Sequence, residues 1–156
     1  MAISRETIVG PCSYVVYRGY WCHGQRTGSL GEPCAELERI CALTREAQDA
    51  GLEVMKPGAP VGGVARAVRK KAAASGWEIQ GGRIGHGMGL DYSERPVLNE
   101  SNETPLQAGT TAVVHSTFSL PGSGKMFVPL GDVCHVTASG PEFLMSFQRE
   151  PFVAGA

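Results

Sequence analysis

The sequence predicts an α/β protein of the α+β type, with a strand pair, two consecutive helices and then mostly sheet. Two observations carry this prediction. Apolar residues recur at three- and four-residue steps in the first half, and β-prone runs bounded by glycine fill the second half. The chain has 156 residues, of which 42% are hydrophobic and 19% charged, as in folded globular proteins. We therefore expect residues 1–156 to form a single domain.

Composition and charge exclude several classes of protein. A net charge of -1 without a sustained basic run argues against a nucleic-acid partner. No run approaches the roughly 18 to 20 apolar residues of a membrane span, and the first residues lack the apolar core of a signal peptide. The 5 cysteines are odd in number and show no Cys-x-x-Cys spacing, which argues against a disulfide framework or zinc ribbon. We expect a cytoplasmic protein with reduced thiols and no membrane partner.

The first 54 residues predict a hairpin and a helix. Residues 7–17 and 20–23 are β-prone, and Arg18-Gly19 separates them like a tight turn. Pro33 is then placed like the first-turn proline of a helix. One stripe of apolar and small residues follows at helical spacing: Leu37, Ile40, Cys41, Thr44, Ala47, Gly51 and Val54. This stripe predicts an amphipathic helix of about five or six turns.

A second helix is predicted between Lys56-Pro57-Gly58, which ends the first, and Gly76. Its two faces differ in character: Val61, Val64, Ala65, Val68 and Ala72 are apolar, and Arg66, Arg69, Lys70 and Lys71 are basic. We interpret the basic face as a solvated helix surface and infer no anion site from it.

The second half predicts short strands at residues 110–120, 126–130, 133–137 and 143–147. Residues 99–105 form a polar loop in this interpretation, and residues 138–141 form a turn between the last two strands. Within residues 85–89, three glycines bracket His86 and leave its ring accessible. No lysine and no helix pattern follow, which excludes a phosphate-binding loop. On this local evidence His86 is either structural or functional.

The order of these motifs resembles the creatinase/aminopeptidase family, which includes methionine aminopeptidase, aminopeptidase P and prolidase. Residues 85–89 are similar to its Gly-His-Gly-x-Gly segment. The other similar pieces occur in the family's order: Gly19-Tyr20 with Arg26-Thr27, like its Gly-Tyr-x-x-Asp-x-x-Arg-Thr strand, then Lys56-Pro57-Gly58, residues 105–109, the strand through His115, and residues 131–142. The resemblance covers residues 8–147.

The resemblance implies a pita-bread fold, in which two similar halves of helices and antiparallel strands form one curved sheet around the active site. This chain is similar to the C-terminal half alone. We therefore expect half of a pita-bread fold, with two helices on a curved, mainly antiparallel sheet. An unpartnered half exposes a sheet edge and apolar surface. We expect either a fragment of a longer protein, or a homodimer or partner chain that supplies the missing half.

The residues at the family's metal-binding positions differ from the family pattern. Metal-dependent members are similar to one another in five ligands: Asp, Asp, His, Glu and Glu. The matching positions here carry Cys12, His23, His86, His115 and Gly131. The resemblance therefore implies that the dinuclear carboxylate site is not retained.

One hypothesis is a metal-free hydrolase. Creatinase shares the fold and hydrolyses a C-N bond without a metal, with histidine as proton carrier. The resemblance thus implies a creatinase- or aminopeptidase P-like hydrolase of a peptide or a small amide or guanidino substrate. His86 or His115 is the candidate general base. Glu94 keeps the family position, although Ser93 replaces the family's second histidine. Glu94 either orients an imidazole, binds a substrate cation, or is a surface carboxylate.

A second hypothesis is a change of metal. His23 and His115 fall on ligand positions although neither was used to align the motifs. Imidazole and thiolate favour a transition metal such as Zn²⁺, and Cys12, His23, His86 and His115 are the candidate ligands of one ion. The alternatives are a metal-free histidine cluster and a catalytically inactive homologue that acts as a structural or interaction module.

Overall fold

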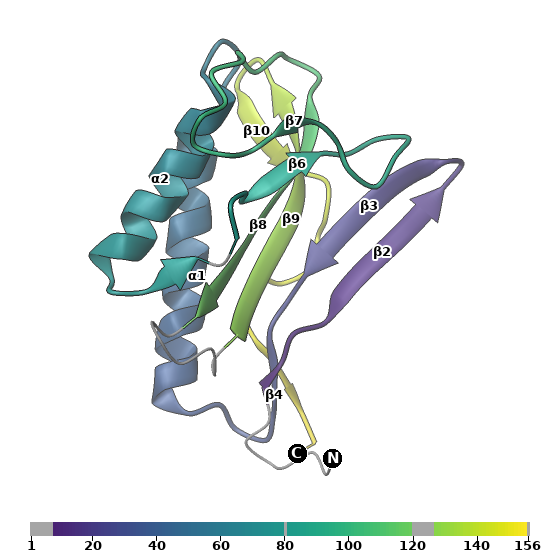
Figure 1. Ribbon diagram of the computed structural model, residues 1–156. Helices are drawn as coiled ribbons and strands as arrows, with labels where there is room; N and C mark the ends of the chain where they lie inside the picture. Colours follow the sequence, from purple (N-terminus) through teal and green to yellow (C-terminus); the bar gives the residue numbers. More distant parts are fainter. Residues whose placement is uncertain (1–7, 80, 120–126, 156) are drawn as a thin grey trace.

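Two helices cover one face of an eight-stranded antiparallel sheet, from which the β2–β3 hairpin projects (Figure 1). The computed structural model describes residues 8–79, 81–119 and 127–155. The helices are α1 (Ala35–Glu53) and α2 (Val61–Ala74). The large sheet contains β2 (Cys12–Tyr17), β3 (Tyr20–Gln25), β5 (Glu78–Ile79), β6 (Gly85–Gly87), β7 (Glu94–Val97), β8 (Thr111–Ser119), β9 (Phe127–Thr137) and β10 (Gly140–Phe143). A smaller sheet joins β1 (Ile8–Val9), β4 (Gly28–Leu30) and β11 (Phe152–Ala154).

Both predicted helices are confirmed, and most of the predicted stripe residues are buried. Two details are wrong: Val54 follows the end of α1 and is exposed, and Pro33 precedes the N-cap residue Cys34 and so lies outside the first turn. In α1 the buried residues include Leu37, Ile40 and Ala47, and in α2 they include Val64 and Val68. Gly51 brings the helices close together, because a Cβ atom at this position would lie 2.5 Å from Val68 Cγ2. In the described residues, neither helix is long and apolar enough to cross a membrane.

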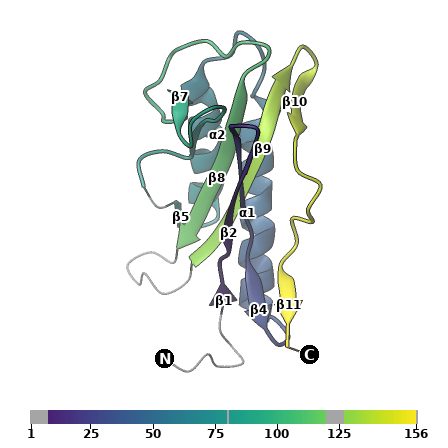
Figure 2. The same cartoon turned by 90° about the vertical axis from the view of Figure 1, so that its right-hand side faces the viewer.

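The central strands have one face toward the helices and one face away from them (Figure 2). Ala112, Val114 and Phe118 of β8 belong to the large core cluster that also contains helix residues. Since successive side chains of a strand point to opposite faces, Val113 and His115 face away from the helices. Val113 packs there in a second cluster with Met88 and Val133.

Two details of the predicted strands are wrong. The runs at 126–130 and 133–137 are one strand, β9, because β8 pairs with it continuously from Ser119↔Phe127 to Thr111↔His135. The last strand is Gly140–Phe143 rather than 143–147, because the turn at 138–139 returns the chain directly onto β9. Of the predicted strand ends, residues 120 and 126 lie outside the described residues.

The β2–β3 hairpin is confirmed, but it meets the rest of the sheet through a single cross-strand pair, Gln25↔Gly131. The next residue, Arg26, strengthens this contact from a buried position. Its guanidinium donates hydrogen bonds to Asp132 Oδ1 at 2.6 Å and to the backbone oxygen of Gly131 at 2.9 Å. It also donates to the backbone oxygen of Gln148 at 2.7 Å. Arg26 therefore joins the hairpin to β9 and to the C-terminal segment.

Replacement of Ile40 with Ala tests the placement of α1. Ile40 is fully buried, so we expect the change to lower the free energy of unfolding by roughly 2 to 5 kcal/mol. The matched control is Glu38→Ala on the exposed face of the same helix, with an expected effect below about 0.5 kcal/mol. Urea denaturation followed by circular dichroism measures both. An equally small effect at Ile40 would contradict the core position.

Candidate functional site

The predicted site residues come together on the sheet face that points away from the helices. The strand register places Cys12 opposite Gln25, Gln25 opposite Gly131, and Gly131 opposite His115. These four positions form one row across β2, β3, β9 and β8. Three of the five family ligand positions therefore share one row, although they are far apart in sequence.

His23 and His86 complete what we call the histidine cluster, which consists of His23, His86 and His115. The ring centroid of His115 lies 5.6 Å from that of His23 and 5.4 Å from that of His86. The cluster draws one ring from each of β3, β6 and β8. The three histidines that were predicted to meet therefore lie close together in the folded chain.

His86 presents a free nitrogen lone pair to its surroundings. Its Nδ1 lies 2.9 Å from the backbone oxygen of Gly87. Since a carbonyl oxygen only accepts hydrogen bonds, Nδ1 is the donor and carries the proton of the neutral ring. The unprotonated Nε2 is buried and has no hydrogen-bond partner among the described residues. Burial lowers the pKa of His86, so the neutral ring that can accept a proton is favoured.

The other two rings are also held neutral near pH 7. Burial lowers the pKa of His115 to about 3, and the neighbouring His23 and His86 rings add to this effect. Burial, with a smaller contribution from His86, lowers the pKa of His23 to about 4. Three close imidazoles cannot all be charged in a buried site, so the cluster contains uncharged bases.

Cys12 lies at the open side of the cluster. Its Sγ is 3.0 Å from His23 Nε2 and 3.0 Å from the hydroxyl oxygen of Tyr14. The Tyr14 ring stacks on the His23 ring with centroids 4.6 Å apart. The Tyr14 hydroxyl is also 3.4 Å from that of Tyr92, whose ring lies 5.4 Å from the His86 ring. Side-chain hydrogen bonds, chiefly with Cys12 and then with Tyr92, raise the pKa of Tyr14.

Tyr14, Tyr92 and Gln25 belong to this site but were not predicted from the sequence. Tyr14 lies two residues after Cys12, so strand periodicity alone places both on one face of β2. The sequence pattern of β2 therefore already indicated that Tyr14 lies on the same face as Cys12. Tyr92 lies in the loop between β6 and β7, and no periodicity connects it to the cluster.

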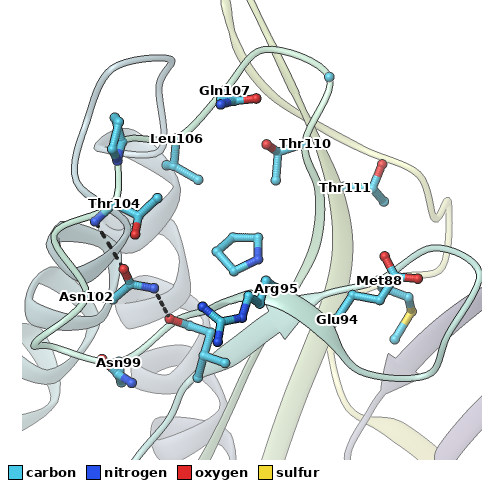
Figure 3. Close-up of a pocket in the computed structure, with 14 residues that line it drawn as sticks. Met88, Glu94, Arg95, Asn99, Asn102, Thr104, Leu106, Gln107, Thr110 and Thr111 are labelled. Carbon is cyan, nitrogen blue, oxygen red and sulfur yellow. Dashed lines mark hydrogen bonds between the residues drawn. The ribbon is translucent and has the colours of Figure 1, made fainter.

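Glu94 is placed beside the cluster and not in it. Its Oε1 accepts a hydrogen bond of 2.7 Å from the backbone N–H of Asp91. Together with Met88 and Thr111 it lines a pocket of about 750 Å³ (Figure 3). None of the three cluster histidines lines this pocket. Among the described residues, the Glu94 carboxylate makes no hydrogen bond to an imidazole, and its predicted role in orienting one stays a prediction.

The remaining pocket lining is mainly neutral and polar. The predicted 99–105 loop supplies Asn99, Asn102 and Thr104, and Arg95 of β7 adds a cation (Figure 3). Two bonds fix Asn102: its side chain donates to the backbone oxygen of Val97 at 2.8 Å and accepts from the backbone N–H of Thr104 at 3.1 Å. This loop is thus ordered by its own side chains at the edge of the site.

The donor set does not fit a dinuclear carboxylate site. The row carries a thiol, an amide, a glycine and an imidazole, and a Cβ atom on Gly131 would lie only 2.9 Å from His115 Cβ. Within residues 8–79, 81–119 and 127–155, no group of three or more His, Cys, Asp or Glu side chains is arranged to hold a metal ion. A single transition-metal ion such as Zn²⁺, held by Cys12 and the three histidines, stays a prediction.

Comparison with known proteins identifies the relatives of the chain. Residues 4–138 match the sequence profile of metallopeptidase family M24. An uncharacterized peptidase of Staphylococcus aureus strain USA300 is 29% identical over 136 residues, which are 86% of this chain and 38% of that protein. The dipeptidase PepE from Mycobacterium ulcerans has a TM-score of 0.90 and 27% identity, over 98% of this chain and 41% of its own. The prolidase from Pyrococcus horikoshii OT3 has a TM-score of 0.87 and 26% identity, over 96% and 43%.

The neutral histidine cluster makes the stability of the fold depend on pH. The folded-state pKa values of His23 and His115, about 4 and about 3, lie below the value of about 6.5 for an unfolded histidine. The unfolded chain therefore binds protons first as the pH falls, and stability that is complete above about pH 6.5 is lost progressively toward the folded-state values of about 4 and about 3. We expect His115→Gln to reduce this slope by up to about 1.4 kcal/mol per pH unit.

Denaturant titrations at several pH values measure this slope. Ile40→Val is the control, because it weakens the core and leaves every histidine in place. It is expected to keep the slope of the unaltered chain. Identical slopes for His115→Gln and the unaltered chain would show that His115 does not hold a depressed pKa.

Proposed function

Because this chain belongs to metallopeptidase family M24, we propose that it contributes to hydrolysis of a C–N bond in a peptide or a small amide or guanidino substrate. The dipeptidase and prolidase to which it is similar are peptidases by name. The chain spans 38% of the curated relative and 41% and 43% of the two structures. The reaction of the whole protein and its substrate therefore belong to this proposal.

The observation that carries the proposal is the free Nε2 of His86. A neutral imidazole with an unprotonated, buried and unpartnered nitrogen is the form required of a general base. Such a base accepts a proton from the attacking nucleophile and returns it to the leaving group. The hydrogen bond from Nδ1 to the Gly87 oxygen fixes the ring orientation during both transfers.

His115 and Glu94 are assigned supporting roles in this proposal. His115 is a second neutral ring beside His86, with ring centroids 5.4 Å apart, and it is suited to accept a hydrogen bond from the substrate or from water. Glu94 lines the adjoining pocket, where its carboxylate is suited to a cationic part of the substrate, such as an amino or guanidino group. These histidine and glutamate roles are closer to the metal-free chemistry of creatinase than to the chemistry of a dinuclear metallopeptidase.

The second candidate is an interaction module, which the outer hairpin favours. Val15, Val16, Tyr17 and Tyr20 are large, apolar and at least half exposed. β2 is the terminal strand of the large sheet, and β3 is its partner there (Figure 1). A flat, uncharged edge strand pairs readily with another strand. We infer that a second copy of the chain, or a partner chain, pairs along β2 and covers this side of the site.

Replacement of His86 with Asn tests the hydrolytic function. We expect the rate to fall by about a hundred- to ten-thousandfold, because Asn supplies no base. The unaltered chain is assayed by mass spectrometry on three probes: an Xaa-Pro dipeptide, an N-acyl amino acid amide and creatine. Each assay is run with a chelator and with added Zn²⁺, so that metal dependence is read in the same experiment.

His135→Asn is the matched control, because His135 lies on β9 near its turn to β10 and outside the histidine cluster. It is expected to retain the full rate. Circular dichroism confirms that both variants are folded. Unchanged hydrolysis by His86→Asn, or no hydrolysis of any probe by the unaltered chain, would overturn the proposed function.

Replacement of Val15 with Lys tests the edge pairing. We expect the chain to associate at micromolar concentration, and the variant to be monomeric, since a charged residue on an edge strand opposes pairing. Multi-angle light scattering gives both masses. Lys70→Glu on the exposed face of α2 is the charge-changing control. A monomeric unaltered chain with a cooperative melt and no binding of a hydrophobic dye would contradict the pairing.

A further inference from the structure

We propose that Cys12 is a covalent nucleophile, with His23 as its base and the Gln25 side-chain amide as a donor to the developing oxyanion. This inference rests on the proposed C–N hydrolysis and narrows its substrate class to carboxamides, including peptide bonds. It assigns to Cys12 and His23 a role different from that of metal ligands.

The contact between thiol and imidazole carries the inference. Cys12 Sγ lies 3.0 Å from His23 Nε2, within the range expected of a nucleophile and its base. Cys12 is exposed, whereas His23 is only 1% exposed. A substrate can therefore approach the sulfur from solvent, while the base stays in a fixed orientation under the stacked Tyr14 ring.

The remaining groups around the sulfur suit the charges that form during attack. Gln25 Nε2 lies 3.6 Å from Cys12 Sγ, so its N–H groups are beside the carbon that the sulfur would attack. A neutral amide donor in this place is suited to an oxyanion. The Tyr14 hydroxyl, 3.0 Å from the sulfur, can reverse its hydrogen bond and donate to a thiolate. His23 Nδ1 is buried and has no partner among the described residues.

The other thiols of the chain lack this environment. Burial raises the pKa of Cys41 to about 11 and that of Cys134 to about 12, so both behave as inert core residues. Burial also raises the pKa of Cys22. Cys34 is exposed and precedes α1, but its side chain makes no capping hydrogen bond. Cys34 is therefore an internal reference for an exposed thiol without a base.

The reaction balances with an amide and water. The sulfur of Cys12 bonds to the amide carbonyl carbon as its proton moves to His23 Nε2. When the C–N bond breaks, His23 returns that proton to the leaving nitrogen, and a thioester with the acyl group remains. Water then attacks the thioester carbon and gives a proton to His86 Nε2, the general base of the proposed hydrolysis. The carboxylic acid leaves, and the proton returns to the sulfur.

The first experiment measures thiol reactivity and needs no amide substrate. The native chain is treated with iodoacetamide at pH 7, and peptide mapping gives the rates at Cys12 and Cys34. We expect Cys12 to react about tenfold faster, and His23→Gln to abolish this advantage. Equal rates at the two cysteines in the unaltered chain would overturn the proposal.

The second experiment detects the acyl intermediate with p-nitrophenyl acetate as the probe. We expect a burst of one nitrophenolate per chain and an acetyl group on Cys12 by mass spectrometry. Cys12→Ala should lose both, and Cys34→Ala should keep both.

The same variants are assayed on the amide probes. If Cys12→Ala hydrolyses amides at the full rate, the assignment of Cys12 as the nucleophile is wrong, and the proposed hydrolytic function stands. If Cys12 is acetylated but no amide is cleaved, the nucleophile stands and the hydrolytic function fails.

Discussion

The buried pair between Arg26 and Asp132 is the interaction on which the arrangement of the site depends. The hairpin that carries Cys12 and His23 meets the central strands through one cross-strand pair. The Arg26 side chain reinforces that pair with hydrogen bonds to Asp132 and to the Gly131 backbone. A buried ion pair is costly to break from one side, because the remaining charge has no water to solvate it. Together with the hydrogen bond from the Trp21 backbone N–H to the Gly89 oxygen at 2.8 Å, this guanidinium holds one half of the site in position relative to the other.

The Arg26 guanidinium also connects the site to the C-terminal segment and, through it, to α1. It donates to the Gln148 backbone oxygen, and the next residue, Arg149, donates to the side chains of Gln48 and Asp49 on α1. Gln48 in turn donates to the Val114 backbone oxygen, one residue before His115. A continuous set of hydrogen bonds thus runs from the hairpin through the C-terminal segment and α1 to β8. Both sides of the histidine cluster are attached to it.

Imidazoles at positions where the resemblance implies carboxylates change what this face can do. Carboxylates close together repel one another unless a cation lies between them, whereas neutral imidazoles can share a buried site without one. Burial then determines the protonation state, and the rings of His23 and His115 stay uncharged near pH 7. Gly131, opposite His115, has no room for a side chain, because a Cβ atom there would lie 2.9 Å from His115 Cβ. The face is consequently suited to proton transfer and to nucleophilic attack by a neighbouring thiol.

The sequence by itself determined the two helices, the hairpin and the choice of Cys12, His23, His86 and His115 as residues that meet at the site. Helical spacing gave the buried faces of α1 and α2 because local periodicity and core burial agree there. The order of motifs matched His23, His86 and His115 to metal-ligand positions of the family that the chain resembles. Sequence did not determine that β9 is continuous or that β10 starts at Gly140, since distant β8 and a local turn decide these pairings. Nor did it reveal the Cys12–His23 contact, the tautomer of His86, or the place of Tyr92. These depend on cross-strand register and on burial, which exist only after segments far apart in the chain have packed together.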